Sequence, residues 1–138
     1  MKNASAVADF LVSHPAVASV NYPRLQTGNA ARRANAYLPD GYGGLVGFEL
    51  KDGFAVGQAF INALRLFYHV ANIGDARSLA IHPASTTHSQ LAADEQRDTG
   101  VTEGYVRPSV GIEHINDIIT DLSQALNASS GALSSAAE

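Results

Sequence analysis

The sequence predicts an α+β fold, with one sheet of about four strands covered on one face by helices and open or docked elsewhere on the other. Short β-branched or apolar runs alternate along the chain with longer segments that have the helical spacing of apolar residues. Glycines and prolines separate most of these segments. At 138 residues with 46% hydrophobic content, the chain is long enough for one domain with one core.

A helix, a strand and a second helix are predicted in the first forty or so residues. Apolar residues recur at helical spacing up to Leu11, and Ser13-His14-Pro15 ends that helix. The β-branched run Val17 to Val20 predicts a strand, which Asn21-Tyr22-Pro23 closes. The alanine-rich segment Asn29 to Leu38 predicts the second helix.

A glycine-rich stretch precedes the next predicted strand, Leu45 to Leu50. It could be interpreted as a phosphate-binding loop, with Gly41, Gly43, Gly44 and Gly47 as its glycines. However, no Gly-Lys-Ser/Thr follows, and the glycines lead into a strand instead of opening a helix. A flexible entry to the strand is the preferred interpretation.

The clearest helical pattern spans Phe54 to His69, where one apolar stripe repeats over four turns. A strand is predicted at Ser78 to Ile81 and a loop at Pro83 to Ser89. A short polar helix follows around Ala92 to Arg97, ahead of a strand at Tyr105 to Val110.

The last predicted helix runs from Asp117 to Leu126, with Ile115 at the start of its apolar pattern. After it, residues 127–138 are rich in serine and alanine and have too little apolar surface to bury, so a flexible tail is expected. Residues 1–126 are thus predicted to form the folded domain.

Charge and cysteine content exclude several classes of function. The net charge of -4, with no basic cluster beyond Arg32-Arg33, argues against nucleic-acid or anionic-membrane partners. The absence of cysteine excludes disulfides and zinc-cysteine sites. No apolar run reaches the ~20 residues of a membrane span, so we expect a soluble chain, and a cytoplasmic location fits.

Arg107 is the main candidate for binding chemistry. Its neighbours on the predicted strand are apolar or aromatic, so little else near it in sequence carries charge. A guanidinium in such a setting matches a carboxylate with two parallel hydrogen bonds. The residues alone leave two possibilities open, which are a bound anion and a structural partner such as Glu113 or Asp75.

Two other interpretations of the polar loop are less favoured. His82 and His88 could ligate a metal, but no third ligand follows at a recognisable spacing. The loop hydroxyls could suggest a hydrolase, but there is no Gly-x-Ser-x-Gly elbow, and such hydroxyls more often bind turn backbone.

Three motifs with their separations carry a resemblance to a known family. They are NIGD at 72–75, SLAIHPASTTHSQL at 78–91 and RPSVGIE at 107–113. In this order they resemble the C-terminal part of the cysteine/methionine-metabolism pyridoxal-phosphate enzymes, and most of all the O-acetylhomoserine sulfhydrylases. The resemblance covers nearly the whole chain. It implies the small C-terminal domain of fold-type I enzymes, with a mostly antiparallel sheet.

The resemblance also assigns roles to individual residues. Arg107 stands where the family's arginine holds the substrate α-carboxylate, and Asn72 stands where a Ser or Asn begins a segment that helps to grip it. The loop with Ser85, Thr86, Thr87 and His88 is placed at the active-site mouth. The motif differs from the family at Pro108, where a leucine is expected. A proline either sits at a strand edge or weakens the strand pairing there.

The family's reaction needs a Schiff-base lysine, and the only lysines here are Lys2 and Lys51. Neither lies in the family's lysine motif, so we expect this chain to bind no pyridoxal phosphate and to be inactive alone. The resemblance implies that a longer parent uses pyridoxal phosphate and O-acetylhomoserine, exchanging acetate for sulfide or a thiol. The alternatives are the same domain from a methionine or cystathionine γ-lyase or synthase, and a non-catalytic interaction module. In either case we expect the bare docking face to meet the missing large domain or to self-associate.

Overall fold

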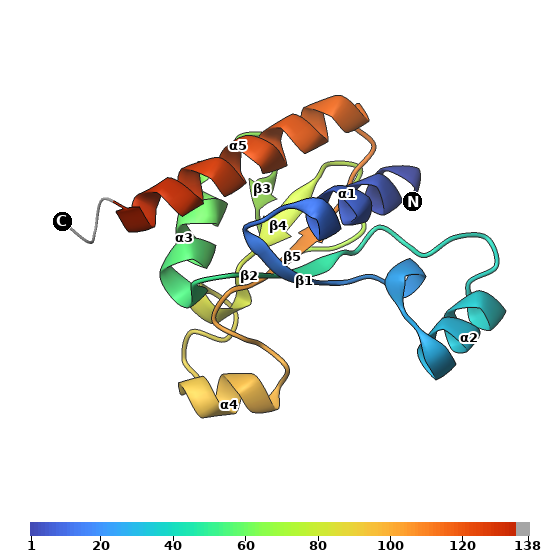
Figure 1. Cartoon of the computed structure of the whole chain (residues 1–138), viewed down its shortest axis with the longest axis horizontal. Helices are drawn as coiled ribbons and strands as arrows, with labels where there is room; N and C mark the ends of the chain where they lie inside the picture. The colour runs from blue at the N-terminus through green and yellow to red at the C-terminus, as the bar shows by residue number, and fades with distance from the viewer. Residues whose placement is uncertain (135–138) are drawn as a thin grey trace.

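A computed structural model describes residues 1–134 and shows five helices, two short 3-10 turns and one five-stranded sheet within them (Figure 1). The helices are α1 (Lys2–Ser13), α2 (Gly28–Tyr37), α3 (Gly53–Ala63), α4 (Ala93–Asp98) and α5 (Ile115–Ser134). The strands are β1 (Val17–Asn21), β2 (Gly47–Leu50), β3 (Tyr68–His69), β4 (Leu79–Ile81) and β5 (Tyr105–Ser109). The turns are η1 (Pro23–Leu25) and η2 (Pro83–Ser85).

The sheet has the strand order β1-β2-β5-β4-β3, which places β5 at its centre. Every pairing is antiparallel except that of β3 with β4. The predicted α+β fold with a mostly antiparallel sheet is therefore confirmed, and the four predicted strands are all present. The additional strand is the two-residue β3 at the edge.

The core lies between the sheet and a layer formed by α1, α3 and α5, on the same side of the sheet in Figure 1. Phe48 of β2 meets Phe60 of α3 edge to face, with 5.6 Å between the ring centroids. Ile118 and Leu122 of α5 are fully buried against the same cluster. Each such side chain contributes roughly 1.5–3 kcal/mol through burial, so this layer provides most of the stability.

The prediction that the third helix continues to His69 is wrong. Helix α3 ends at Ala63, because the carboxylate of Asp121 on α5 accepts the backbone N–H groups of the next turn: Arg65 at 2.9 Å, Leu66 at 2.8 Å and Phe67 at 3.3 Å. Phe67 still enters the core, as its apolar character suggested. The chain is then extended, and His69 lies in β3 instead of at a helix end.

The predicted end of the last helix at Leu126 is also wrong. Helix α5 continues to Ser134, and within the supposed tail Ser129 is fully buried. The Ser129 hydroxyl donates to the Leu126 carbonyl, so a small polar residue is accommodated in the buried helix. The remainder of the predicted tail, residues 135–138, lies outside the described residues.

Pro108 lies in the central strand, and the pairing beside it is incomplete. The β2–β5 register joins Phe48 to Val106 and resumes with an isolated bridge between Leu45 and Ser109. Between them Val46 donates to the Pro108 carbonyl at 3.1 Å, but proline has no N–H to return the bond. The expectation of weakened pairing is confirmed, whereas the strand-edge alternative is not what the fold shows. Within the described residues, no helix is long and apolar enough to cross a membrane.

Candidate functional site

Arg107 lies on the central strand and lines a cavity of about 350 Å³. The cavity is lined by Ala71, Ile81, Pro83, Thr87, His88, Thr99, Val101, Tyr105 and Arg107. The Arg107 side chain is half-buried, and its Nη2 donates to the Ala71 carbonyl at 3.3 Å. Its Nε is buried and has no hydrogen-bond partner within the part of the chain that the structure describes. An unpartnered buried guanidinium donor is costly, and the cavity beside this side chain has room for an anion that could pair with the guanidinium.

Neither carboxylate considered as a structural partner of Arg107 pairs with it. Glu113 accepts hydrogen bonds from the Ser78 backbone N–H at 2.6 Å and from the Ser78 hydroxyl at 2.8 Å. Asp75 accepts the Arg77 N–H at 2.9 Å. In residues 1–134 the one salt bridge present joins Arg24 to Asp9, far from this site in the sequence.

Electrostatically, this cavity suits an anion. None of the described residues that line it carries a carboxylate, so Arg107 is its only fixed charge apart from any on His88. Tyr105 lies two positions before Arg107 on the same face of β5. Burial raises the pKa of the Tyr105 phenol, although the nearby Arg107 charge acts in the opposite direction. Tyr105 is thus a neutral hydroxyl at physiological pH.

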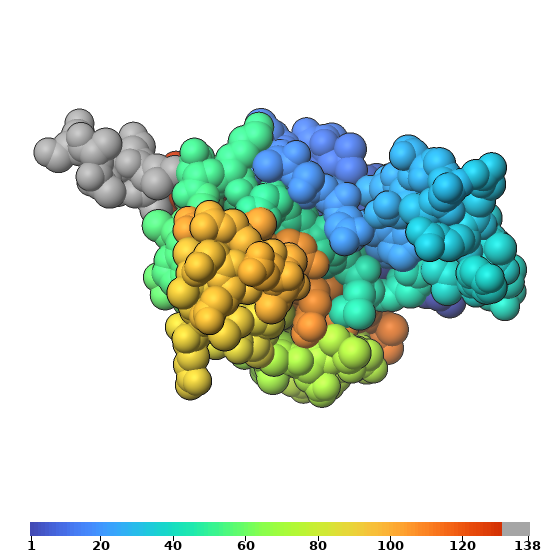
Figure 2. Space-filling view, turned by 90° about the horizontal axis from the view of Figure 1, so that it is seen from below, coloured from blue at the N-terminus to red at the C-terminus, as the bar shows by residue number. Residues whose placement is uncertain are grey.

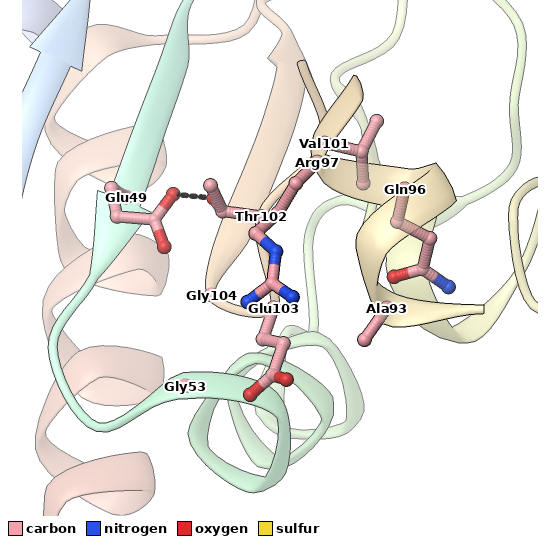
Figure 3. A pocket seen from close by; sticks show the side chains of 9 residues that line it. All are labelled: Glu49, Gly53, Ala93, Gln96, Arg97, Val101, Thr102, Glu103 and Gly104. Carbon is pink, nitrogen blue, oxygen red and sulfur yellow. Dashed lines mark hydrogen bonds between the residues drawn. The ribbon is translucent and has the colours of Figure 1, made fainter. Parts of the chain in front are cut away.

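Another arginine-bearing cavity, next to the first, has a different charge environment. It has a volume of about 300 Å³, shares Val101 with the first, and is lined by Arg97 of α4 together with Glu49 and Glu103 (Figure 3). Figure 3 shows the Glu49 carboxylate bonded to the Thr102 hydroxyl. Two carboxylates beside one arginine disfavour an anionic ligand. Of these two cavities, the one beside Arg107 is therefore the better candidate for binding an anion.

The predicted mouth loop divides into two parts. Thr87 and His88 line the Arg107 cavity, and the Thr87 hydroxyl lies 2.9 Å from Nδ1 of His88. Ser85 and Thr86 do not line it, and their hydroxyls donate to the His82 carbonyl at 3.3 Å and 2.8 Å. The expectation that such hydroxyls bind turn backbone holds for these two residues.

Asn72 is exposed and does not line the cavity, although its neighbour Ala71 does. The structure therefore brings the backbone of this segment, and not the Asn72 side chain, next to Arg107. Figure 2 shows this side of the molecule, where orange atoms of the β5 region are visible between the gold α4 region and the yellow-green segment that follows α3.

His82 has a structural environment. It is fully buried, with Nδ1 at 2.9 Å from the Ser85 hydroxyl and Nε2 at 2.7 Å from the Glu103 carbonyl. Burial lowers the pKa of His82, so its imidazole is neutral. Gly57 of α3 leaves the room for this ring, since a Cβ there would lie 2.4 Å from Nε2. No group of three or more metal-ligating side chains occurs in the described chain.

The two lysines lie away from Arg107. Lys51 donates to the Pro15 carbonyl at 2.6 Å and lines a different cavity, together with His14 and Asp52. Lys2 is exposed at the start of α1. Neither side chain lines the Arg107 cavity.

The sequence interpretation missed Tyr105 and Ser109 as neighbours of the site. The Ser109 hydroxyl accepts the Gly74 N–H at 3.1 Å, which joins β5 to the segment containing Asn72. The period of two along a strand places residues 105, 107 and 109 on one face, and this signal could have identified both.

Comparisons of the sequence and of the structure with known proteins point to the same enzyme family. The model of the family "Cys/Met metabolism PLP-dependent enzyme" matches residues 1–127. An O-acetyl-L-homoserine sulfhydrylase from Leptospira meyeri is 54% identical over 90% of this chain and 28% of its own length. An L-methionine gamma-lyase from Pseudomonas putida is 44% identical over 92% of this chain and 32% of its own length.

A solved structure from Campylobacter jejuni, described as an O-acetylhomoserine (thiol)-lyase with a pyridoxyl-lysine monophosphate at position 205, has a TM-score of 0.83 and 41% identity. The match covers 91% of this chain and 30% of that one. The present chain thus spans less than a third of the length of these relatives.

Proposed function

The chain belongs to the Cys/Met metabolism PLP-dependent enzyme family, and from this premise we propose that it is the C-terminal, substrate-carboxylate-binding domain of a longer O-acetylhomoserine sulfhydrylase. The observation that carries the proposal is Arg107: among the described residues its buried Nε has no partner, and none of their carboxylates lines the cavity beside it. A substrate α-carboxylate would supply two acceptors to this planar donor group.

The chain's own residues do not fit the family's cofactor. Lys2 and Lys51 both lie outside the Arg107 cavity, so no amine of this chain stands where it could bind pyridoxal phosphate beside the substrate. We therefore propose no catalytic residue in this chain and no activity for it alone. The parent would use pyridoxal phosphate to replace the acetate of O-acetylhomoserine with sulfide or a thiol, in the synthesis of homocysteine or methionine.

In this proposal the chain contributes binding and orientation. Arg107 would hold the α-carboxylate, with the backbone near Asn72 beside it. Thr87 and His88 would form part of the cavity mouth, and Ser85 and Thr86 would keep the loop in shape through their bonds to the His82 carbonyl. Holding a substrate at fixed orientation is a major component of enzymatic rate enhancement.

A methionine γ-lyase is the second candidate for the parent, because such enzymes are 42–45% identical to this chain. Methionine and O-acetylhomoserine share the α-carboxylate and differ in the side chain. Arg107 would bind both in the same way, so the distinction must come from parts of the parent that contact the γ-substituent.

We propose that the remainder of the parent covers the side of the sheet that carries Arg107. Exposed apolar side chains lie along this part of the molecule, with Ile73 at 53% and Ile112 at 82% exposure. Because relatives are about three times longer, their additional chain is the expected occupant. Sedimentation velocity of the purified chain tests which partner covers this side of the sheet. A concentration-dependent dimer would identify a second copy of this chain as the occupant instead.

The main test is a titration of the purified chain with O-acetylhomoserine, followed by NMR chemical shifts. Binding at about millimolar Kd is expected, since one arginine without the rest of the site provides few contacts. Arg107→Ala should weaken it about tenfold or more. Arg97→Ala, an arginine in the cavity that also holds Glu49 and Glu103, is the matched control and should leave the Kd unchanged.

Binding that survives Arg107→Ala would refute the proposed site. A parallel titration with pyridoxal phosphate, followed by imine absorbance, should show no stoichiometric imine. A stoichiometric imine would mean that Lys2 or Lys51 is a cofactor site.

A further inference from the structure

The segment from residue 70 to 77 connects the parallel strands β3 and β4 and is exposed along its whole length. Two side chains of β5 attach its first half to the sheet. Arg107 donates to the Ala71 carbonyl at 3.3 Å, and the Ser109 hydroxyl accepts the Gly74 N–H at 3.1 Å. Because they are two positions apart on one strand, Arg107 and Ser109 face the same side of the sheet.

We propose that Ser109 is a positioning residue, which holds residues 71–74 beside Arg107 so that the guanidinium meets a substrate carboxylate in a defined orientation. This inference rests on the proposed function. If Arg107 turns toward a ligand carboxylate, its bond to the Ala71 carbonyl is weakened or shared. The Ser109 bond then remains to hold this half of the segment in place.

The local geometry suits this role. Ser109 is only 3% exposed, so its hydroxyl is fixed by the surrounding strands. Gly74 has φ of +74°, and a Cβ there would meet nothing within 4 Å. Glycine is therefore needed for the backbone conformation and not for space, and that conformation directs the N–H of residue 74 to Ser109.

The hydrogen bond between Ser109 and Gly74 should stabilise the exposed segment more than the fold as a whole. The segment is exposed, so water can reach the Gly74 N–H if the hydroxyl is removed. Loss of the hydroxyl should therefore have little effect on global unfolding and a larger effect on the order of residues 71–74.

The test compares Ser109→Ala with wild type in two measurements on the whole chain. Hydrogen exchange by NMR should show Gly74 exchanging about fivefold faster or more, with the core amides of α5 unchanged. The Kd for O-acetylhomoserine, measured well below the unfolding temperature, should rise about three- to tenfold. Ser109→Thr keeps the hydroxyl and should restore both values toward wild type.

Ser129→Ala is the control for loss of a buried hydroxyl, because Ser129 lies on α5 and bonds within its own helix. It should change neither measurement. Equal Gly74 exchange in wild type and Ser109→Ala would overturn the inference, as would faster exchange with an unchanged Kd. If wild type binds no carboxylate, the proposed function fails, and the exchange result alone decides whether Ser109 holds the segment.

Discussion

Arg107 of β5 and Ala71 are 36 positions apart in the sequence, yet the guanidinium of the first donates to the carbonyl of the second at 3.3 Å. The same guanidinium keeps its Nε buried and unpartnered among the described residues. One donor of the group is thus satisfied by the fold and another is not. An unpartnered buried donor costs stability, which fits the proposed role of Arg107 in binding an anion.

Replacing Arg107 with methionine should therefore separate binding from stability. Arg107→Met keeps the aliphatic part of the side chain and removes the unpartnered buried donor, so the free energy of unfolding should stay within about 1 kcal/mol of wild type or rise slightly. Urea denaturation measures this. A loss above about 2 kcal/mol would show that Arg107 is chiefly structural.

Asp121 should be among the most sensitive polar positions. Asp121→Ala leaves the backbone N–H groups of Arg65, Leu66 and Phe67 without their carboxylate, and we expect a loss of about 2–4 kcal/mol in the free energy of unfolding. Asp117→Ala, on an exposed face of the same helix, is the control and should cost about 1 kcal/mol or less. Similar losses in the two variants would contradict the structural role given to Asp121.

Gly57→Ala should destabilise the chain even though alanine is the better helix former by about 1 kcal/mol. The new Cβ would meet the buried His82 ring at 2.4 Å, and such overpacking costs about 1–3 kcal/mol. Thermal unfolding should give a lower Tm for Gly57→Ala. The neighbouring Gln58→Ala is exposed and should leave the Tm nearly unchanged. A higher Tm for Gly57→Ala would mean that the ring does not occupy this space.

The pH dependence of stability should report His82. Burial lowers its pKa below the ordinary value of 6.5, so the unfolded chain binds the proton more tightly than the folded chain does. The free energy of unfolding is then unaffected by this group well above pH 6.5. It decreases as the pH falls below 6.5, until the folded-state pKa is passed. His14, whose pKa burial also lowers, acts in the same direction.

Urea denaturation between pH 7.5 and 5 measures this effect. His82→Gln should lower stability at pH 7.5 and reduce its dependence on pH. The control His114→Asn, which keeps an acceptor at the exposed start of α5, should retain the wild-type pH dependence. An unchanged dependence in His82→Gln would contradict a buried neutral imidazole.

Much of the fold could be predicted from the sequence because its signals are local. The β-branched run before Asn21 and the apolar period of the last helix depend only on neighbouring residues, and both elements are present, although the last helix extends beyond its predicted end. Arg107 could be chosen as a candidate for the same reason, since the apolar residues on both sides of it are visible in the sequence. The end of the third helix could not be predicted in this way, because a distant residue sets it: Asp121 ends α3 from 56 positions away.

By itself, the sequence determined the fold class, the central arginine and the absence of a suitable lysine, because periodicity and residue identity are properties of the chain. Only the tertiary structure decided which charged side chains surround each arginine. Arg97 shares its cavity with Glu49 and Glu103, whereas no described carboxylate lines the cavity of Arg107. The tertiary structure also joined Ser109 to Gly74, which is 35 positions away in the sequence. Charge neighbours and hydrogen bonds of this kind depend on distances in space, which local sequence patterns do not contain.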